Sequence, residues 1–347
     1  MSRPTVIALV ACCLIGLVPS SADAQTYEQI IRAYRRGEFD SAGMVMSALI
    51  ESAERRRERE DWLNLAVKER RGADLAAALM LHTEVAFSRV AFTGPPESSN
   101  MPVHFVIVDF IYDALRPLPD RRTFLRNWYL LWESLRQSNP VWINRGRADY
   151  LRRGLDMFPD DSELLLAMGA RYELAWWALQ ENSHHRVDGG GSAESLLRSA
   201  RDYLRKSSRS PQPTSETNLR LSRVLTLLGE LDAASAELER FKTVREGPVL
   251  QYLGLLFEGD LLERRGNLTA AARAYDQAVA LVGVPQSALI ARAHLAYVLG
   301  ERRDAAAAVV TAMGLSEKQS DPWWWYIRGM SWRAIFYLDR GRRMVRQ

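Results

Sequence analysis

Cysteine is almost absent from this chain of 347 residues, which contains two, Cys12 and Cys13. Both lie in an apolar stretch close to the N-terminus, so a chain that has lost this stretch has no thiol. Disulfides, cysteine nucleophiles and cysteine-ligated metal sites are then excluded. The absence of thiols suits an oxidising compartment, and a chain with an adequate apolar core needs no disulfides.

Motifs for catalysis, phosphate binding and metal binding are also missing. Past the N-terminal stretch there is no GxSxG, HExxH, CxxC or GxGxxG pattern, and the chain has five histidines. His82 and His104 belong to apolar helical segments, where a histidine is expected to be a hydrogen-bonded core residue. Catalysis at neutral pH usually needs a positioned base or nucleophile, and few candidates are present. We therefore expect no enzymatic activity, no cofactor and no metal.

One polar stretch, residues 184–192, could carry chemistry. It reads His-His-Arg-Val-Asp-Gly-Gly-Gly-Ser, so its histidines and Asp188 could ligate a metal, and its glycines could hold an anion. Neighbouring residues of an extended loop point apart, however, and no GKS or GKT sequence follows to complete a phosphate loop. We interpret the stretch as a flexible surface loop between two helices. An enzyme acting through His184 and His185 is the competing hypothesis.

Only one long apolar run is present, and it lies at the N-terminus. Arg3 precedes an apolar run over residues 6–18, and residues 22–24 (Ala-Asp-Ala) have the small side chains that signal peptidase requires. This order predicts a secretory signal peptide over residues 1–24, with Gln25 as the first mature residue. We therefore expect an exported protein, periplasmic or secreted, that does not span a membrane.

The N-terminal run allows two other interpretations. A retained membrane anchor needs about 20 apolar residues, and this run is shorter and interrupted by Gly16 and Pro19. Lipid attachment at Cys12 is suggested by residues 9–12 (Leu-Val-Ala-Cys), which resemble a lipobox, although more apolar sequence follows them.

A strong excess of one charge is also absent. The chain has 46 Lys and Arg against 42 Asp and Glu, a net charge of +4. Mixed-sign runs such as residues 54–60 (Glu-Arg-Arg-Arg-Glu-Arg-Glu) predict a solvated, salt-bridged helix face. Since the basic residues do not gather on one face with stacking aromatics, nucleic acid is not an expected partner.

The sequence does contain self-similarity at a nearly fixed period. Three segments align, each with a glycine followed five positions later by an alanine, and the segments are residues 226–234, 262–271 and 297–305. Their glycines, Gly229, Gly266 and Gly300, are 37 and 34 residues apart. This spacing and the residues around it resemble the tetratricopeptide repeat family.

The resemblance implies an all-α fold, a right-handed superhelix (solenoid) of antiparallel helix pairs. Each glycine would end the first helix of a pair, where a positive φ is needed. The alanine that follows (Ala234, Ala271 or Ala305) would let the second helix pack closely, with apolar residues such as Leu238 and Tyr275 continuing the core. An irregular helical bundle that only looks periodic is the alternative.

Beyond the signal peptide, the chain divides into regions that differ in how closely they match the repeat pattern. Repeats are clear over 158–315, whereas 25–157 is a helical region with degenerate copies, among them residues 33–42. A separate helical domain over 60–157 is the alternative. In 316–347, an Asp-Pro helix start and Gly329 are followed by no second glycine turn, so we expect a capping helix that closes the end of the solenoid.

A solenoid of helix pairs lines its concave groove with the first helix of each pair, and this groove is the expected binding surface. The residues expected to face it are Arg220, Arg223, Asp260, Glu263, Arg264, His294, Tyr297, Trp323, Tyr326 and Arg333. Their mixture of arginine, carboxylate and aromatic side chains suits a protein or peptide partner. The sequence thus favours a non-enzymatic scaffold or adaptor of the cell envelope or periplasm. The alternative is a small-molecule or glycan-binding module that uses the tryptophans at 323–325 for stacking.

Overall fold

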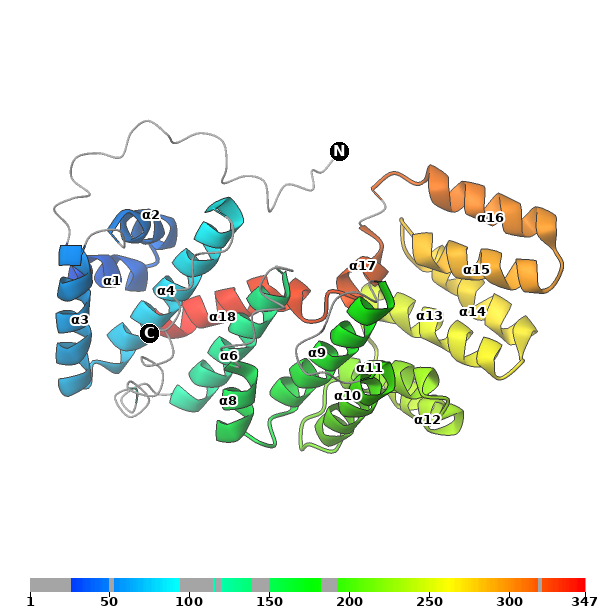
Figure 1. The fold of residues 1–347 in the computed structure, drawn as a ribbon, viewed down its shortest axis with the longest axis horizontal. Helices are drawn as coiled ribbons and strands as arrows, with labels where there is room; N and C mark the ends of the chain where they lie inside the picture. Colours follow the sequence, from blue (N-terminus) through cyan, green and yellow to red (C-terminus); the bar gives the residue numbers. More distant parts are fainter. Residues whose placement is uncertain are drawn as a thin grey trace. The chain divides into compact units, whose positions relative to one another are not determined.

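All regular secondary structure in the described part of the chain is helical. The computed structural model describes residues 26–49, 53–93, 115, 120–138, 150–181, 192–317 and 320–346, and no strand occurs among them (Figure 1). The all-α class predicted from the sequence is therefore confirmed. The predicted signal peptide, both cysteines and most of the histidine-containing loop (182–191) lie outside the described residues.

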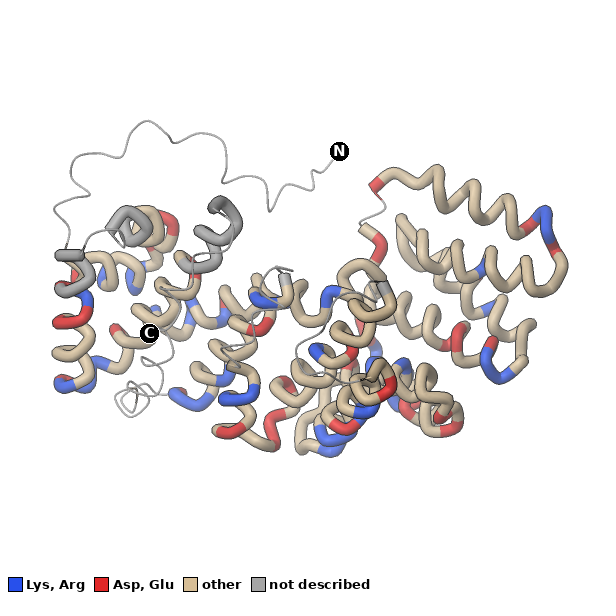
Figure 2. Tube along the Cα trace, in the orientation of Figure 1, with Lys and Arg blue, Asp and Glu red and all other residues tan. Residues whose placement is uncertain are grey.

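The chain forms two compact units, which are described separately. The first consists of residues 1–124 and 339–347, and the second of Leu125–Leu338. The part of 25–157 that follows Phe124, assigned on sequence to the N-terminal region, belongs to the second unit. Lys and Arg are interspersed with Asp and Glu over the described helices, and neither sign of charge collects on one helix alone (Figure 2).

The described part of the first unit contains four complete helices and the C-terminal end of another. Its helices are α1 (Tyr27–Arg35), α2 (Phe39–Leu49), α3 (Ala53–Lys68), α4 (Gly72–Thr93) and the last residues of α18 (Ala334–Val345). Thr26 and Gln29 form a capping box at the start of α1, which satisfies backbone donors that the helix cannot pair itself. His82 is 4% exposed and lies 2.7 Å from the Tyr27 hydroxyl through Nε2. It is a hydrogen-bonded core residue, as expected from its apolar neighbours.

The second unit is built mainly from helices that pack in adjacent pairs (Figure 1). Its helices are α6 (Arg121–Ser138), α8 (Tyr150–Met157), α9 (Ser162–Glu181), α10 (Ala193–Ser208), α11 (Ser215–Leu227), α12 (Leu231–Lys242), α13 (Pro248–Arg264), α14 (Leu268–Leu281), α15 (Gln286–Val298), α16 (Arg302–Gly314), α17 (Pro322–Tyr326), a 3-10 turn (Ser331–Arg333) and the beginning of α18. We call α9, α11, α13 and α15 the first helices, and α10, α12, α14 and α16 the second helices.

The repeat glycines end first helices in the backbone conformation that the sequence predicts. Gly229, Gly266 and Gly300 have φ values of 79°, 76° and 82°, a region that favours glycine because it has no Cβ. At each of them the next residue donates its backbone N–H to a carbonyl five residues earlier, as Glu230 does to Leu225. This is the Schellman arrangement, and it pairs carbonyls that the helix end would leave unsatisfied.

The second helices pack against the first through small residues, again as predicted. Ala234 and Ala271 are fully buried, and Ala305 is 8% exposed. Contact between α13 and α14 is so close that a Cβ added to Gly259 would lie 2.1 Å from the Tyr275 ring. A larger residue at position 259 would therefore force the two helices apart.

The C-terminal segment differs from the predicted capping helix. Residues 320–338 form the short helix α17, the 3-10 turn and the start of α18 instead of one helix. Their hydrogen bonds and ring contacts within the second unit are to α6, α9, α11, α13 and α15, as in the bonds from Tyr326 to Glu173 and from Asn127 to the Tyr337 carbonyl. Tyr326 and Met330 are buried in this arrangement, so the segment removes apolar surface from water by packing against the first helices.

Candidate functional site

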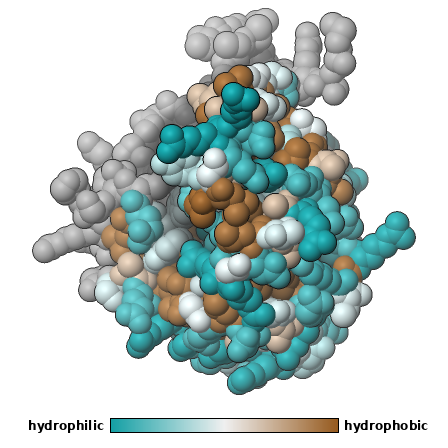
Figure 3. Space-filling view, turned by 90° about the vertical axis from the view of Figure 1, so that its right-hand side faces the viewer, coloured by the Kyte–Doolittle hydropathy of each residue, from teal (hydrophilic) through white to brown (hydrophobic). Residues whose placement is uncertain are grey.

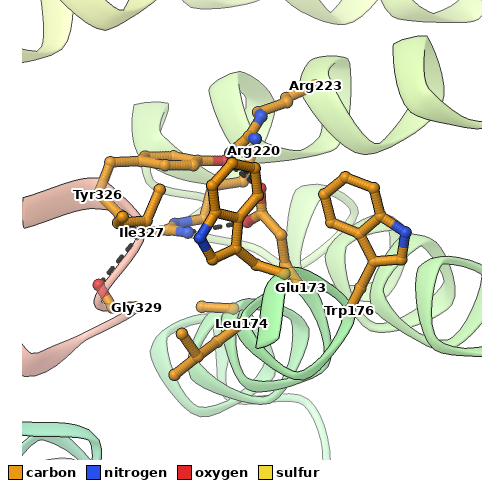
Figure 4. Close-up of a pocket in the computed structure, with 10 residues that line it drawn as sticks. Glu173, Leu174, Trp176, Arg220, Arg223, Tyr326, Ile327 and Gly329 are labelled. Atoms are coloured by element: carbon orange, nitrogen blue, oxygen red, sulfur yellow. Dashed lines mark hydrogen bonds and ion pairs between the residues drawn. The ribbon is translucent and has the colours of Figure 1, made fainter. Parts of the chain in front are cut away.

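A buried ionic cluster joins α9, α11 and the C-terminal segment. Glu173 and Arg220 are 3% and 1% exposed, and Arg220 Nη1 lies 2.8 Å from Glu173 Oε2. The other carboxylate oxygen, Oε1, accepts hydrogen bonds from Arg223 Nη1 at 3.0 Å and from the Tyr326 hydroxyl at 2.5 Å. Arg220 also donates to the Gly329 carbonyl, so one guanidinium connects helix α11 to the turn after α17 (Figure 4).

The Arg223 guanidinium is surrounded by aromatic rings. Its Cζ lies 4.4 Å from the ring centre of Trp323, 4.9 Å from that of Tyr326 and 5.2 Å from that of Phe257. Trp323 and Tyr326 are also stacked on each other, with ring centres 5.8 Å apart. Cation–π attraction in so buried a setting is worth up to about 2 kcal/mol, and it fixes both Arg223 and the tryptophan.

The cluster continues to the 3-10 turn through a second buried carboxylate. Glu216 Oε1 accepts from Arg220 Nε at 2.8 Å, and Glu216 Oε2 is paired with Arg333. Burial by itself raises the pKa of Glu216, but the charges of Arg333 and Arg220 outweigh it, so the pKa is below its ordinary value. Glu216 therefore stays ionised, and the C-terminal segment is held by charge as well as by apolar contact.

A similar buried pair connects α6 with α9. Glu133 is 2% exposed and accepts hydrogen bonds from Arg171 at 2.5 Å and from Arg136 at 2.9 Å. Burial alone raises the pKa of Glu133, but Arg136 and Arg171 hold it far below the ordinary range.

Acid is therefore expected to destabilise the second unit. Because the folded-state pKa values of Glu133 and Glu216 are depressed below the ordinary 4.5, their contribution is fully present above that pH. It is lost as the pH falls towards the folded-state values, and the free energy of unfolding should be about 2 kcal/mol or more lower near pH 3 than at pH 7. Urea titrations at the two pH values measure this difference. The difference between the two pH values should be smaller in Glu133→Gln than in the unaltered protein. An equal difference in the two proteins would contradict the depressed pKa of Glu133.

Beside the cluster lies an open groove of about 810 Å³. It lies among three first helices, α11, α13 and α15, together with α14 and α17, and its lining residues are Arg223, Leu227, Leu256, Phe257, Asp260, Glu263, Arg264, Tyr275, Gln286, Ser287, Ile290, Ala291, His294, Trp323 and Trp324. Leu256 and Phe257 are 8% and 4% exposed, whereas Ile290 is 44% exposed. The groove thus has an apolar interior, and Ile290 is the most exposed of the aliphatic side chains that line it.

Polar and charged side chains line the outer part of the groove and contact one another. Arg264 Nε lies 2.9 Å from Asp260 Oδ1, and His294 Nδ1 lies 3.0 Å from Glu263 Oε1. The Tyr275 hydroxyl donates to the other oxygen of Glu263 at 3.1 Å. Pairs this exposed contribute little to stability, so a ligand can take over one member at small cost.

The structure separates the ten residues predicted from the sequence to face a common groove. Six line it, and these are Arg223, Asp260, Glu263, Arg264, His294 and Trp323. Arg220, Tyr326 and Arg333 belong to the ionic cluster instead, because the C-terminal segment covers this part of α11. Tyr297 is 66% exposed and does not line the groove.

Sequence reasoning missed the apolar part of the lining. Ile290 precedes His294 by four residues and shares its helix face, so helical spacing gives a signal for it. Phe257 and Trp324 carry no such signal, because their position depends on how the C-terminal segment packs against α13. Trp325 is 41% exposed and is absent from the lining, so the three tryptophans do not form one platform.

The described residues contain no group of three or more His, Cys, Asp or Glu arranged to hold a metal ion. His104, His184 and His185 lie outside them. None of the described helices combines the length and the apolar character needed to cross a membrane.

Comparison with known proteins gives no relative from which a function could be transferred. No protein-family model and no curated protein matches this sequence. The class of protein is therefore defined by its architecture, an all-α chain whose helices pack in adjacent pairs and carry a groove beside a buried ionic cluster.

Proposed function

We propose that this protein is a non-enzymatic scaffold or adaptor of the tetratricopeptide repeat type, which holds a peptide segment of a partner protein in the groove. The observation that carries this proposal is the groove of about 810 Å³, to which three successive first helices contribute side chains. Helix pairs with glycine turns at a spacing of 37 and 34 residues support the family.

The chemistry of the groove favours a peptide with apolar anchors. Leu256, Phe257 and Ile290 offer an apolar surface, while Asp260 and Arg264 present both signs of charge at its edge. A peptide could bury one or two large apolar side chains there and exchange its own charges or backbone groups for the exposed ion pairs.

The proposed place of action is the periplasm or the cell exterior. The support is the order of a basic residue, an apolar run and an Ala-Asp-Ala site over the first 24 residues, which is typical of a secretory signal. A partner would then be another exported or envelope protein.

Site-specific photo-crosslinking in the native cell tests the groove. A benzoyl-phenylalanine at position 290 is expected to form an adduct with a partner polypeptide, because Ile290 is exposed at 44% within the groove. The same group at Val244, which is 48% exposed and lies outside the groove, is the matched control and should give no such adduct. Mass spectrometry of the adduct identifies the bound segment and its apolar residues.

A charged residue introduced into the groove provides a second test. Ile290→Glu should abolish co-purification of the crosslinked partner, whereas Val244→Glu should leave it unchanged, since burying an unpaired carboxylate is costly. Adducts that form equally from both positions, or a partner that tolerates Ile290→Glu, would contradict binding in the groove.

A small-molecule or glycan ligand is the second candidate. It is favoured by the volume of about 810 Å³, which falls within the range of small-molecule pockets, and by the rings of Trp323 and Trp324 in the lining. The same crosslinking experiment separates the candidates, because a groove that holds a small molecule yields no polypeptide adduct.

A further inference from the structure

Among the described residues, the groove is lined by two carboxylates and two arginines. Asp260 and Glu263 lie three residues apart on α13, and their side chains are 39% and 21% exposed. The arginines are Arg223 and Arg264. The charge that the groove presents to a ligand therefore depends on whether each arginine is accessible.

Arg223 is enclosed and does not offer its charge to a ligand. It is 6% exposed, its Nη1 donates to Glu173, and its Cζ lies 4.4 Å from the ring centre of Trp323. Turning towards a ligand would cost it both the buried carboxylate and the aromatic contact. Arg264 is then the accessible arginine of the groove, and one guanidinium cannot neutralise two carboxylates.

The partners of Glu263 can both bind it without a positive charge. Oε1 lies 3.0 Å from His294 Nδ1, and Oε2 accepts from the Tyr275 hydroxyl at 3.1 Å. An imidazole N–H and a phenol donate such bonds in their neutral forms. Burial raises the pKa of Tyr275, and the charges of Glu263 and Asp260 raise it further, whereas Arg264 lowers it with a smaller effect. This part of the groove is therefore negative.

Asp260 retains an acceptor that a ligand can use. Its Oδ1 accepts from Arg264 Nε at 2.9 Å, while its Oδ2 has no hydrogen bond within the described residues. The Arg264 side chain is 43% exposed, and an ion pair this exposed contributes little to stability. A cation from a ligand can thus bind Asp260 beside Arg264 or replace it at small cost.

Apolar surface lies close to these carboxylates. Phe257 and Glu263 are six residues apart on α13, which is about 9 Å along a helix axis. On the face of the second unit that carries α15 and α16, hydrophobic groups likewise lie between hydrophilic ones (Figure 3). An extended peptide rises about 3.3 Å per residue, so side chains two or three positions apart cover the distance from Phe257 to Glu263.

We propose that the groove selects peptide segments in which a large apolar residue lies two or three positions from a lysine or an arginine. This inference rests on the proposed binding of a peptide in the groove. The apolar side chain packs against Phe257 and Ile290, and the cation binds Asp260 and Glu263. Charge-assisted hydrogen bonds to these carboxylates give the preference, because an acidic residue in the same place would be repelled.

Selection from a random peptide library displayed on phage tests the preference. Binders are selected on the purified protein, and those that also bind Ile290→Asn are removed, because this neutral change takes apolar surface from the groove without adding charge. The retained peptides should be enriched in Lys or Arg two or three positions from a large apolar residue. Retained peptides without this enrichment would overturn the inference and leave the proposed function standing. If no peptide is retained, both fail.

Two variants on the same helix show whether Glu263 carries the preference. In fluorescence anisotropy, Glu263→Gln should weaken the binding of a selected peptide about tenfold, because it keeps the shape and removes the charge. Glu258→Gln is the matched control and should leave binding unchanged, since Glu258 also lies on α13, has a side chain 24% exposed and does not line the groove.

The same measurement with an altered peptide separates a contact from an effect on the fold. When glutamine replaces the basic residue of the peptide, Glu263→Gln should no longer change the affinity. An equal tenfold loss with both peptides would show that Glu263 does not act on the cation, and it would overturn the inference.

Discussion

Glu173→Ala is expected to lower the free energy of unfolding of the second unit by about 3–5 kcal/mol. Glu173 is 3% exposed and pairs with Arg220 and Arg223, which are 1% and 6% exposed. Removing the carboxylate leaves two buried guanidinium groups without this partner and the Tyr326 hydroxyl without its acceptor. Buried charges that lose a partner cannot recover the energy of hydration, which is the reason for the large effect.

Chemical denaturation measures the loss, and two variants calibrate it. Glu173→Gln keeps the shape and one acceptor oxygen but removes the charge, so its loss should be intermediate. Glu239→Ala removes an exposed carboxylate that pairs with Lys242 on the surface and should cost less than about 1 kcal/mol. If Glu173→Ala costs no more than Glu239→Ala, the buried cluster does not hold this unit together.

Asp321→Ala is expected to cost about 3 kcal/mol or more and to loosen the C-terminal segment. Asp321 is fully buried and accepts three hydrogen bonds, from the Tyr252 hydroxyl at 3.0 Å, the Ser287 backbone N–H at 2.6 Å and the Trp323 backbone N–H at 2.8 Å. One carboxylate therefore joins α13 to the first turns of α15 and α17. Alanine removes the acceptor of all three donors, of which the Tyr252 hydroxyl is buried and the two backbone N–H groups are partly buried.

Tryptophan fluorescence and limited proteolysis distinguish local loosening from general destabilisation. In Asp321→Ala the half-buried Trp323 should become more exposed, which moves emission to longer wavelength, and cleavage near the start of α17 should become faster. Asp321→Asn retains one acceptor oxygen, so its emission and its cleavage rate should lie between those of the unaltered protein and those of Asp321→Ala. A variant with unchanged emission and cleavage would contradict the role of Asp321 in holding the segment.

The substitutions of Glu173 and Asp321 are expected to affect the shape of the groove as well as the stability of the second unit. Arg223 and Trp323 belong both to the buried cluster and to the groove lining. Loss of Glu173 or Asp321 is therefore expected to change the groove together with the fold. Tests of binding must use residues such as Ile290, which is exposed and outside the cluster.

Part of this architecture could be predicted because it depends on local sequence. Gly229, Gly266 and Gly300 adopt positive φ, and Ala234 and Ala271 are buried, because turn geometry and close helix packing allow few other residues. The five groove residues on first helices were found for a similar reason, since helical spacing places those of one helix on a common face, and they are Arg223, Asp260, Glu263, Arg264 and His294.

The sequence by itself determined that the described chain is helical, where its repeat helices end and which small residues bring the helices of a pair together. Only the tertiary structure decided the course of residues 320–338, and with it the burial of Arg220 and Tyr326. The physical reason is the range of the interactions. Turn conformation and helix periodicity act within a few residues, whereas the ion pairs of Glu173 join residues 47 to 50 positions apart, and its bond to Tyr326 spans 153 positions. Contacts of that range leave no periodic mark in the sequence.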